Sequence, residues 1–234
     1  GKLLMTREIY RVRLGEICFD RKMIRRIVDI GLPAAIQQSI TSFSNVIVQS
    51  YINYFGTAAM AGYSATLRVD GFLQLPLQSF NMTITTFVGQ NIGAKEYKRV
   101  KKGIFTSWLM CSGIILVGSV IMFLKAPSII GIFTEDAAVI SVGSSMIRIF
   151  GSAYLFLPII QILNGALRGA GRSKVPMYFM LGCFVLLRQI YLMIAVPMTK
   201  NVSVVFAGWP VTWVVCAIGM LVYYFKVDWL PKEE

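Results

Sequence analysis

Long windows of this sequence contain no Asp, Glu, Lys or Arg and consist mostly of apolar residues. Each window approaches or exceeds the roughly 20 residues that a membrane-spanning helix needs. The stretch 175–198 is similarly apolar except for Arg188 near its middle, whose insertion cost of about 2.5–3.5 kcal/mol is offset by the surrounding Leu, Ile, Phe and Val. The pattern predicts six spans, at approximately 29–53, 68–93, 103–124, 138–165, 176–198 and 202–225.

Composition also places the chain in a bilayer. Hydrophobic residues make up 56% of it and charged residues 15%, and the mean hydropathy is +0.66. The net charge of +12 would suggest nucleic acid in a soluble protein, but the cations lie in short segments between the apolar windows and form no single basic face. We therefore expect an all-α integral membrane protein that contacts membrane lipid and binds no nucleic acid.

The distribution of basic residues predicts the orientation of the spans, because basic residues beside short spans are retained on the cytoplasmic side. Residues 1–28 contain eight Lys and Arg, and the connection after the second span contains five more, between Lys95 and Lys102. The opposite connections contain Lys125 and Lys200. We expect a multi-pass protein of the cell inner (plasma) membrane with both termini cytoplasmic. The expected plan is a basic cytoplasmic lead segment at 1–28, a six-helix lobe at 29–225 and a cytoplasmic tail at 226–234.

Uncharged polar residues recur at helical spacing within the first two spans. At about 100° per residue, the four on each span fall within a narrow wedge of the helix surface. Lipid cannot satisfy amides, so these faces must meet protein or water. The two open interpretations are interhelical hydrogen bonds and the lining of a wet substrate cavity. The residues are Gln38, Thr41, Asn45 and Gln49 on the first span, and Gln74, Gln78, Asn81 and Thr85 on the second.

Catalytic chemistry has few suitable residues here. The chain contains no histidine, and its eleven acidic residues lie almost wholly in connections or at span ends. Its four cysteines lack the spacing of a metal site. A membrane hydrolase or metalloenzyme needs clustered His, Asp or Glu, or an activated nucleophile. We therefore expect no enzyme, no metal site and no cofactor.

Three charged residues in or beside the spans are candidates for a buried charge: Arg188, Arg148 and Asp70. A buried cation binds an anionic substrate, pairs with an acid elsewhere or is structural, and the sequence leaves these interpretations open. Arg148 lies near enough to a span end to extend toward the interface. Asp70 is either a neighbour of Arg68 on the helix face or part of a gate, although residues two apart point in different directions.

Two pairs of glycines, Gly89–Gly93 and Gly165–Gly169, lie at predicted cytoplasmic ends of spans. Glycines four residues apart let another backbone approach closely. Close packing or a helix-to-loop transition is the main interpretation, and a role in motion is the alternative.

Three stretches resemble the multidrug and toxic compound extrusion family, and the resemblance runs through most of the chain. They are GLPAAIQQSITSFSNVIVQSYINYFG, FNMTITTFVGQNIGAKEYKRVKKG and LNGALRGAGRSKVPM, in the order of the second half of that family, which holds spans seven to twelve of twelve. The resemblance implies one six-helix lobe of a twelve-helix, two-lobed transporter around a central cavity. It also implies export of cationic or aromatic small molecules in exchange for protons or sodium ions, with an N-terminal six-helix lobe as the missing partner.

The chain departs from one branch of the family at the ion-coupling acids. Where that branch has a glutamate about eight positions after GLP, this chain has Thr41, and where it has an aspartate before a glutamine, this chain has Pro158 before Gln161. The match adds Gln161 to the candidate cavity residues. In other branches the coupling aspartate lies in the N-terminal lobe. We therefore expect that the coupling ion, H⁺ or Na⁺, has no identifiable binding acid in this chain.

The resulting prediction is the C-terminal half of an ion-coupled multidrug efflux antiporter that works by alternating access between two lobes. Two alternatives stay open. A flippase for lipid-linked sugars, of the same superfamily, would need a more cationic cavity than two stripes of amides provide. A truncated remnant or assembly protein would not transport, because half a cavity cannot alternate access.

Overall fold

The structure is a computed structural model that describes residues 20–199 and 201–230. Most of the predicted lead segment at 1–28 and the end of the predicted tail lie outside these residues. Every regular element in the described ranges is a helix, which confirms the expected all-α class. The helices are α2 (Arg21–Asn53), α3 (Thr57–Gly93), α4 (Tyr97–Leu124), α5 (Ala126–Gly131), α6 (Ala137–Gly151), α7 (Phe156–Gly169), α8 (Lys174–Met180), the π-helix η2 (Leu181–Leu187), α9 (Arg188–Thr199) and α10 (Val202–Lys226).

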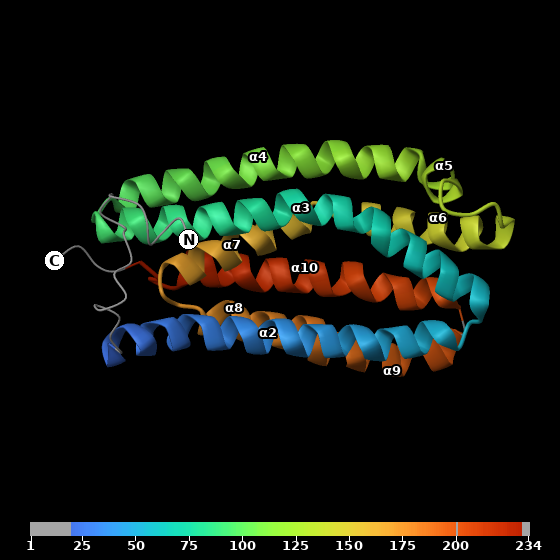
Figure 1. Ribbon diagram of the computed structural model, residues 1–234, viewed down its shortest axis with the longest axis horizontal. Coiled ribbons are helices and arrows are strands. Elements are labelled where there is room, and N and C mark those ends of the chain that lie inside the picture. Colours follow the sequence, from blue (N-terminus) through green and yellow to red (C-terminus); the bar gives the residue numbers. More distant parts are fainter. Residues whose placement is uncertain (1–19, 200, 231–234) are drawn as a thin grey trace, which may run out of the picture.

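The long helices run side by side along the long axis of the molecule (Figure 1). In this view α4 lies along the upper edge, α2 and α9 lie along the lower edge, and α7 and α10 run between them. α3 packs on α4, α6 and α7, whereas α2 packs on α8 and η2. α10 contacts α6, α7 and α9, so it joins the two groups of helices.

The connections rich in basic residues meet at one end of the molecule. The turns after α3 and α7 and the end of α10 lie at the left of Figure 1, and the connections after α2, α4 and α9 lie at the right. An alternation of this kind is what six antiparallel spans require.

Several helices begin well before the predicted spans. α2 begins at Arg21 instead of residue 29, and the Asp20 carboxylate caps it by accepting from the backbone N–H groups of Lys22 (2.8 Å) and Met23 (3.3 Å). α3 begins at Thr57 instead of 68, and α4 at Tyr97 instead of 103. Charged side chains do not break a helix, so a charge-free window marks the apolar part of a helix and not its ends.

The fourth predicted span, 138–165, is divided. α6 and α7 differ in direction by 59°. Between them, the backbone N–H of Ala153 donates to the carbonyl of Phe150 and that of Leu157 donates to Tyr154, both at 3.0 Å. Pro158 follows in the first turn of α7, where its missing N–H breaks no helical hydrogen bond. The break therefore holds Tyr154 outside either helix while keeping it in the core.

Within residues 20–199 and 201–230, three helices are long and apolar enough to cross a membrane, namely α4, the continuous stretch Lys174–Thr199 and α10. The bent pair α6–α7 adds a fourth crossing if it is counted as one span. α2 and α3 have 33 and 37 residues but are less apolar, because they carry the amides and hydroxyls noted in the sequence. Two polar helices at membrane depth need protein or water beside their polar faces.

The Gly165–Gly169 pair packs α7 directly against α3. A Cβ built on Gly165 would lie 2.6 Å from the carbonyl oxygen of Asn81, and one on Gly169 would meet the carbonyl of Thr85 and lie 3.1 Å from Val88 Cβ. Opposite them, a Cβ on Gly89 would lie 3.4 Å from the carbonyl oxygen of Gly169. The packing interpretation therefore holds for these three glycines.

Gly93 has a different environment, because a Cβ there would meet open space. The turn after α3 instead places Lys95 in the left-handed region, at φ 60°, and the Glu96 N–H donates to the Asn91 carbonyl at 2.8 Å. The turn after α7 has the same form, with Gly171 at φ 76° and the Arg172 N–H donating to the Leu167 carbonyl at 2.8 Å. Both helices thus end in a Schellman-type motif, one with glycine and one with lysine at the left-handed position.

Candidate functional site

The polar stripe predicted on the first span lies partly on an outward face of α2. Gln38 and Asn45 are exposed, whereas Thr41 and Gln49 are partly buried. Thr41 Oγ1 donates to the Gln37 carbonyl at 2.8 Å, and Gln49 Nε2 donates to Asn53 Oδ1 at 2.9 Å. Within this stripe, Gln38 and Asn45 are therefore the side chains available to a ligand or to another protein surface.

The inner face of α2 also carries polar groups, which the sequence analysis missed. Gln37 Nε2 donates to Met180 Sδ at 2.6 Å, and Ser44 Oγ donates to the Phe184 carbonyl at 2.9 Å. Both side chains are buried. They attach α2 to α8 and η2 and so fix which face of α2 points outward.

Of the polar stripe predicted on the second span, some side chains are buried in helix contacts and one is exposed. Asn81 Nδ2 donates to the backbone carbonyl of Gln161 at 2.7 Å and to its Oε1 at 3.2 Å, which joins α3 to α7. Thr85 Oγ1 donates to the Asn81 carbonyl at 2.7 Å, and Gln74 Nε2 donates to Asp70 Oδ2 at 3.2 Å. Gln78 alone among the four predicted residues is exposed. The hydrogen-bond interpretation thus fits Asn81 and Gln161, and the cavity interpretation fits Gln78.

A second polar row runs along the exposed face of α3 beside Gln78. Its members are all exposed, and the three hydroxyls donate to carbonyls four residues earlier in the same helix. This row was not predicted, because hydroxyls that can donate to their own helix are ambiguous in a sequence. The row consists of Ser79, Thr83, Thr86 and Gln90.

Two shallow hollows follow this row. One, of about 480 Å³, is lined by Met82, Thr83, Thr86, Phe87 and Gln90. The other, of about 330 Å³, lies between α3 and α4 and adds basic and hydroxyl side chains of α4, which are Arg99, Lys102, Thr106 and Ser107. The exposed face of α3 therefore offers both apolar and polar contacts to a small molecule.

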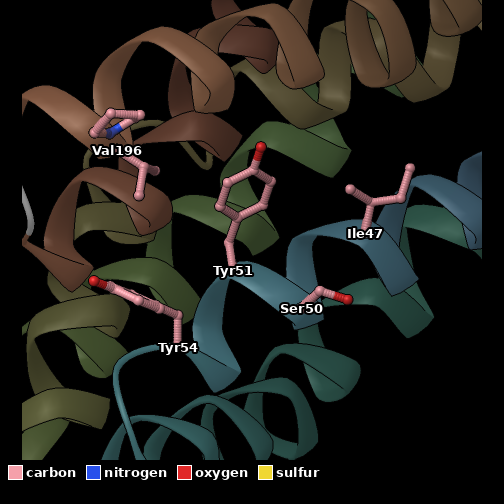
Figure 2. Close-up of a pocket in the computed structure, with 6 residues that line it drawn as sticks. Ile47, Ser50, Tyr51, Tyr54 and Val196 are labelled. Carbon is pink, nitrogen blue, oxygen red and sulfur yellow. The ribbon is translucent and has the colours of Figure 1, made fainter.

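An apolar pocket, of about 480 Å³, lies at the opposite end of the molecule between α2 and α9. Figure 2 shows the rings of Tyr51 and Tyr54 projecting from the end of α2 toward the helix that carries Val196. Ile47, Ser50 and Pro197 complete the lining. The hydroxyls of the two tyrosines and of Ser50 are the polar side-chain groups of this pocket.

Asp70 is directed toward the break between α6 and α7. Its Oδ1 accepts from the Tyr154 hydroxyl at 2.6 Å, and its Oδ2 accepts from Gln74 Nε2 at 3.2 Å. Arg68 is exposed on the other side of the helix, as the two-residue spacing predicts. Asp70 therefore ties α3 to the α6–α7 break.

The two candidate arginines differ sharply in burial. Arg188 is 2% exposed, and its guanidinium donates to Asn45 Oδ1 and Thr212 Oγ1, both at 3.2 Å. Arg148 is exposed in the last turn of α6, so its assignment as a buried charge is wrong. The physical reason is helical phase, because the buried face of α6 is formed by Met146, Ile147 and Phe150.

An aromatic cluster fills the core between Asp70 and Arg188. Tyr154 stacks on Trp213 with ring centroids 5.7 Å apart, and Phe150 lies 5.3 Å from both Trp213 and Trp209. The Arg188 guanidinium carbon lies 5.1 Å from the Trp209 ring. The four-residue spacing of Trp209 and Trp213, which places both rings on one helix face, is the signal of this cluster in the sequence.

The described residues contain no group of three or more His, Cys, Asp or Glu side chains that could hold a metal ion. The arrangement offers amides, hydroxyls and aromatic surfaces, which bind small molecules through hydrogen bonds and apolar contacts.

Comparisons with known proteins agree on one family. A family model described as MatE matches residues 33–194. A protein named probable multidrug resistance protein NorM, from Thermotoga maritima, is 27% identical over 175 residues, which are 75% of this chain and 38% of that protein. The multidrug export protein MepA of Staphylococcus aureus is 22% identical over 156 residues, 66% of this chain and 34% of that protein.

A solved structure shows the same fold. The crystal structure of a MATE protein in a straight conformation matches with a TM-score of 0.86 and 17% sequence identity, over 94% of this chain and 50% of that chain. The chain thus spans about half the length of this solved protein, and its matches cover little more than a third of the curated relatives.

Proposed function

Because this chain belongs to the MatE family, whose model matches residues 33–194, we propose that it forms one six-helix lobe of a multidrug efflux antiporter. Members of the family are transporters and not enzymes, and they are integral membrane proteins. In the proposed mechanism, a second, N-terminal lobe faces this one across a central cavity. The two lobes alternate the access of that cavity between the two sides of the membrane.

The observation that carries this proposal is the outward polarity of α2 and α3. Gln38 and Asn45 on α2 and Gln78 on α3 are exposed, and Gln78 lies beside the row of Ser79, Thr83, Thr86 and Gln90. Hydrocarbon cannot satisfy such groups. The exposed positions of α4 between 109 and 124 are different, since they carry only apolar side chains or glycine, whereas α2 and α3 expose amides between apolar side chains such as Phe43 and Met82. We infer that α4 faces lipid and that α2 and α3 face the wet cavity and the second lobe.

The proposed substrates are cationic or aromatic small molecules. Amides and hydroxyls accept and donate hydrogen bonds without fixing one charge, and Tyr51, Tyr54 and Phe87 offer aromatic contacts. The coupling ion, H⁺ or Na⁺, is proposed to bind in the second lobe, because Thr41 and Pro158 occupy the positions of the coupling acids of one branch. The proposed location is the inner membrane, with both termini in the cytoplasm.

Cysteine accessibility tests the cavity face in the two-lobed assembly. In a cysteine-free background, we expect cysteines at 78, 79 and 83 to react with a small aqueous thiol reagent, and a transported compound to slow the reaction. Cysteines at 109 and 117 are the matched controls, because those side chains are also exposed but are proposed to face lipid. Equal inertness of both groups in every transport state would remove the cavity assignment.

Transport itself supplies the second test. Expressed with a cognate N-terminal lobe in cells that lack other exporters, the chain should support ethidium efflux that collapses with the ion gradient, and expressed alone it should not. Export of a lipid-linked sugar and not of ethidium would favour the flippase alternative. No transport with either lobe arrangement would favour an assembly role.

A further inference from the structure

Arg188 is a buried cation whose hydrogen-bond partners are all neutral. It is 2% exposed and begins α9, directly after the π-helix η2. Asn45 Oδ1 and Thr212 Oγ1 accept from its two terminal nitrogens, and the rings of Phe184 and Trp209 lie 5.3 Å and 5.1 Å from its central carbon. Its Nε–H has no partner within the described residues. Among the residues that the structure describes, the positive charge is therefore solvated by dipoles and aromatic faces.

The nearby acid does not compensate this charge. Asp70 lies across the aromatic cluster, where both of its oxygens already accept hydrogen bonds from Tyr154 and Gln74. The Thr212 hydroxyl proton is also already used, because it is donated to the Trp209 and Gly208 carbonyls at 2.9 Å and 3.0 Å. An ionised side chain in a spanning helix is costly and usually marks a binding or transport function.

Asn45 provides the route to the guanidinium. Its side chain is exposed on the same outward face of α2 as Gln38, yet its Oδ1 reaches inward to Arg188. An oxyanion that arrives over α2 can replace this amide oxygen and accept two parallel N–H bonds, the geometry in which arginine binds carboxylates best. The Phe184 and Trp209 rings beside the guanidinium favour an aromatic group on the ligand.

We propose that Arg188 and Asn45 form an anion-binding site that takes a carboxylate, with Asn45 as the neutral substitute when the site is empty. The carboxylate belongs either to a transported aromatic acid or to an acidic side chain of the second lobe. In the first case the transporter accepts aromatic acids besides cationic compounds. In the second case the pair locks the two lobes together in one state.

A binding titration on this chain in phosphatidylcholine nanodiscs tests the site without any transport step. The probe is benzoate, and benzamide is the neutral control of the same shape. We expect benzoate to bind and to raise the unfolding temperature, and benzamide to do neither. Replacing the charge in Arg188→Gln should weaken benzoate binding roughly 10-fold or more, because a charge-assisted bond is lost. Arg188→Lys should weaken it less, because the charge remains without the planar fork.

Two variants of Asn45 test the same site without removing Arg188, and they replace Arg188→Gln if that variant folds poorly. Asn45→Asp places a tethered carboxylate against the guanidinium, so it should abolish benzoate binding and raise the unfolding temperature. Asn45→Ala keeps Arg188 and should retain benzoate binding. Benzoate binding that is absent from the natural chain, or that is unchanged in both Arg188→Gln and Asn45→Asp, would overturn the proposal.

Repeating the titration on the two-lobed assembly separates the two sources of the carboxylate. Retained benzoate binding identifies a free aromatic acid as the ligand, and lost binding identifies an acid on the second lobe. Because the first titration uses no efflux measurement, a failed transport assay leaves it interpretable, and a failed titration leaves the proposed efflux function untouched.

Discussion

The hydroxyl of Tyr154 donates to Oδ1 of Asp70 at 2.6 Å and thereby connects α3 to the break between α6 and α7. Tyr154 is fully buried and packs against the rings of Phe150 on α6 and Trp213 on α10. The bond is thus a polar contact in a joint that is otherwise formed by aromatic rings around the α6–α7 break. It fixes the position at which the fourth span changes direction.

Removing this hydroxyl should destabilise the lobe. A hydrogen bond to a charged group contributes about 1.5–3 kcal/mol, so Tyr154→Phe should lower the free energy of unfolding by about that amount. Thermal unfolding of the purified protein in nanodiscs measures the effect. Tyr178→Phe is the matched control, because Tyr178 is exposed. Equal unfolding temperatures for the two variants would show that the bond does not stabilise the joint.

The glycines of α7 give a prediction about packing. A Cβ at Gly165 would lie 2.6 Å from a backbone oxygen of α3, which cannot move without displacing the helix. Gly165→Ala should therefore cost about 1–3 kcal/mol of stability, the usual range for overpacking. Gly113→Ala is the control, since a Cβ there meets open space on α4. Similar stability of the two variants would contradict the close approach of α7 to α3.

Replacing Gln78 and replacing Asn81 by leucine should have different effects. Asn81→Leu removes the hydrogen bond to Gln161 and should cost about 0.6 kcal/mol, the average for interhelical bonds in membranes. Gln78→Leu should leave stability unchanged and alter which compounds the two-lobed assembly exports. Unfolding temperatures and efflux of ethidium and a neutral dye measure both. A stability loss at Gln78 without any change in export would assign it to packing.

The sequence predicted most of the fold because apolar windows report membrane crossings directly. Helix ends and bends were missed for a physical reason. The bend at 152–155 depends on tertiary contacts of Tyr154, and the early start of α4 depends on basic residues that are good helix formers. Neither leaves a trace in hydropathy.

The candidate site was predicted only in part. Spacing placed Gln78 and Asn81 on one face of the same helix, but it could not tell which of them the α7 glycines would bury. Arg188 was recognised as unusual because it interrupts an apolar run. Its partners Asn45 and Thr212 lie 143 and 24 residues away, and such long-range pairs are not visible in a single sequence.

Lys95 offers a stabilising substitution. It occupies the left-handed region at φ 60°, where a side chain costs free energy that glycine does not. Lys95→Gly should therefore raise the free energy of unfolding by about 0.5–1 kcal/mol. Lys98→Gly, on an exposed position of helix α4, is the contrasting control and should lower it by a similar amount. A shift of the same sign in both would refute the turn geometry.

Topology can be measured on intact cells. With the basic end in the cytoplasm, cysteines introduced at 135 and 201 should react with a membrane-impermeant maleimide from outside, and one at 96 should react only after lysis. All three positions are exposed. Labelling at 96 from outside would reverse the proposed orientation.

The contacts of the fifth span depend on the number of residues in the π-helix η2. Before it, Met180 Sδ accepts from Gln37 and Asn164, and after it Arg188 reaches Asn45 and Thr212. Each residue of an α-helix turns the chain by about 100°, and each residue of a π-helix turns it by somewhat less, so deleting one residue from 181–187 would rotate one of these groups out of the core. Exchanging one apolar residue for another of similar volume there would be tolerated. Variation within this segment is thus restricted to substitutions, and a single-codon deletion in its coding sequence would damage the lobe more than most replacements.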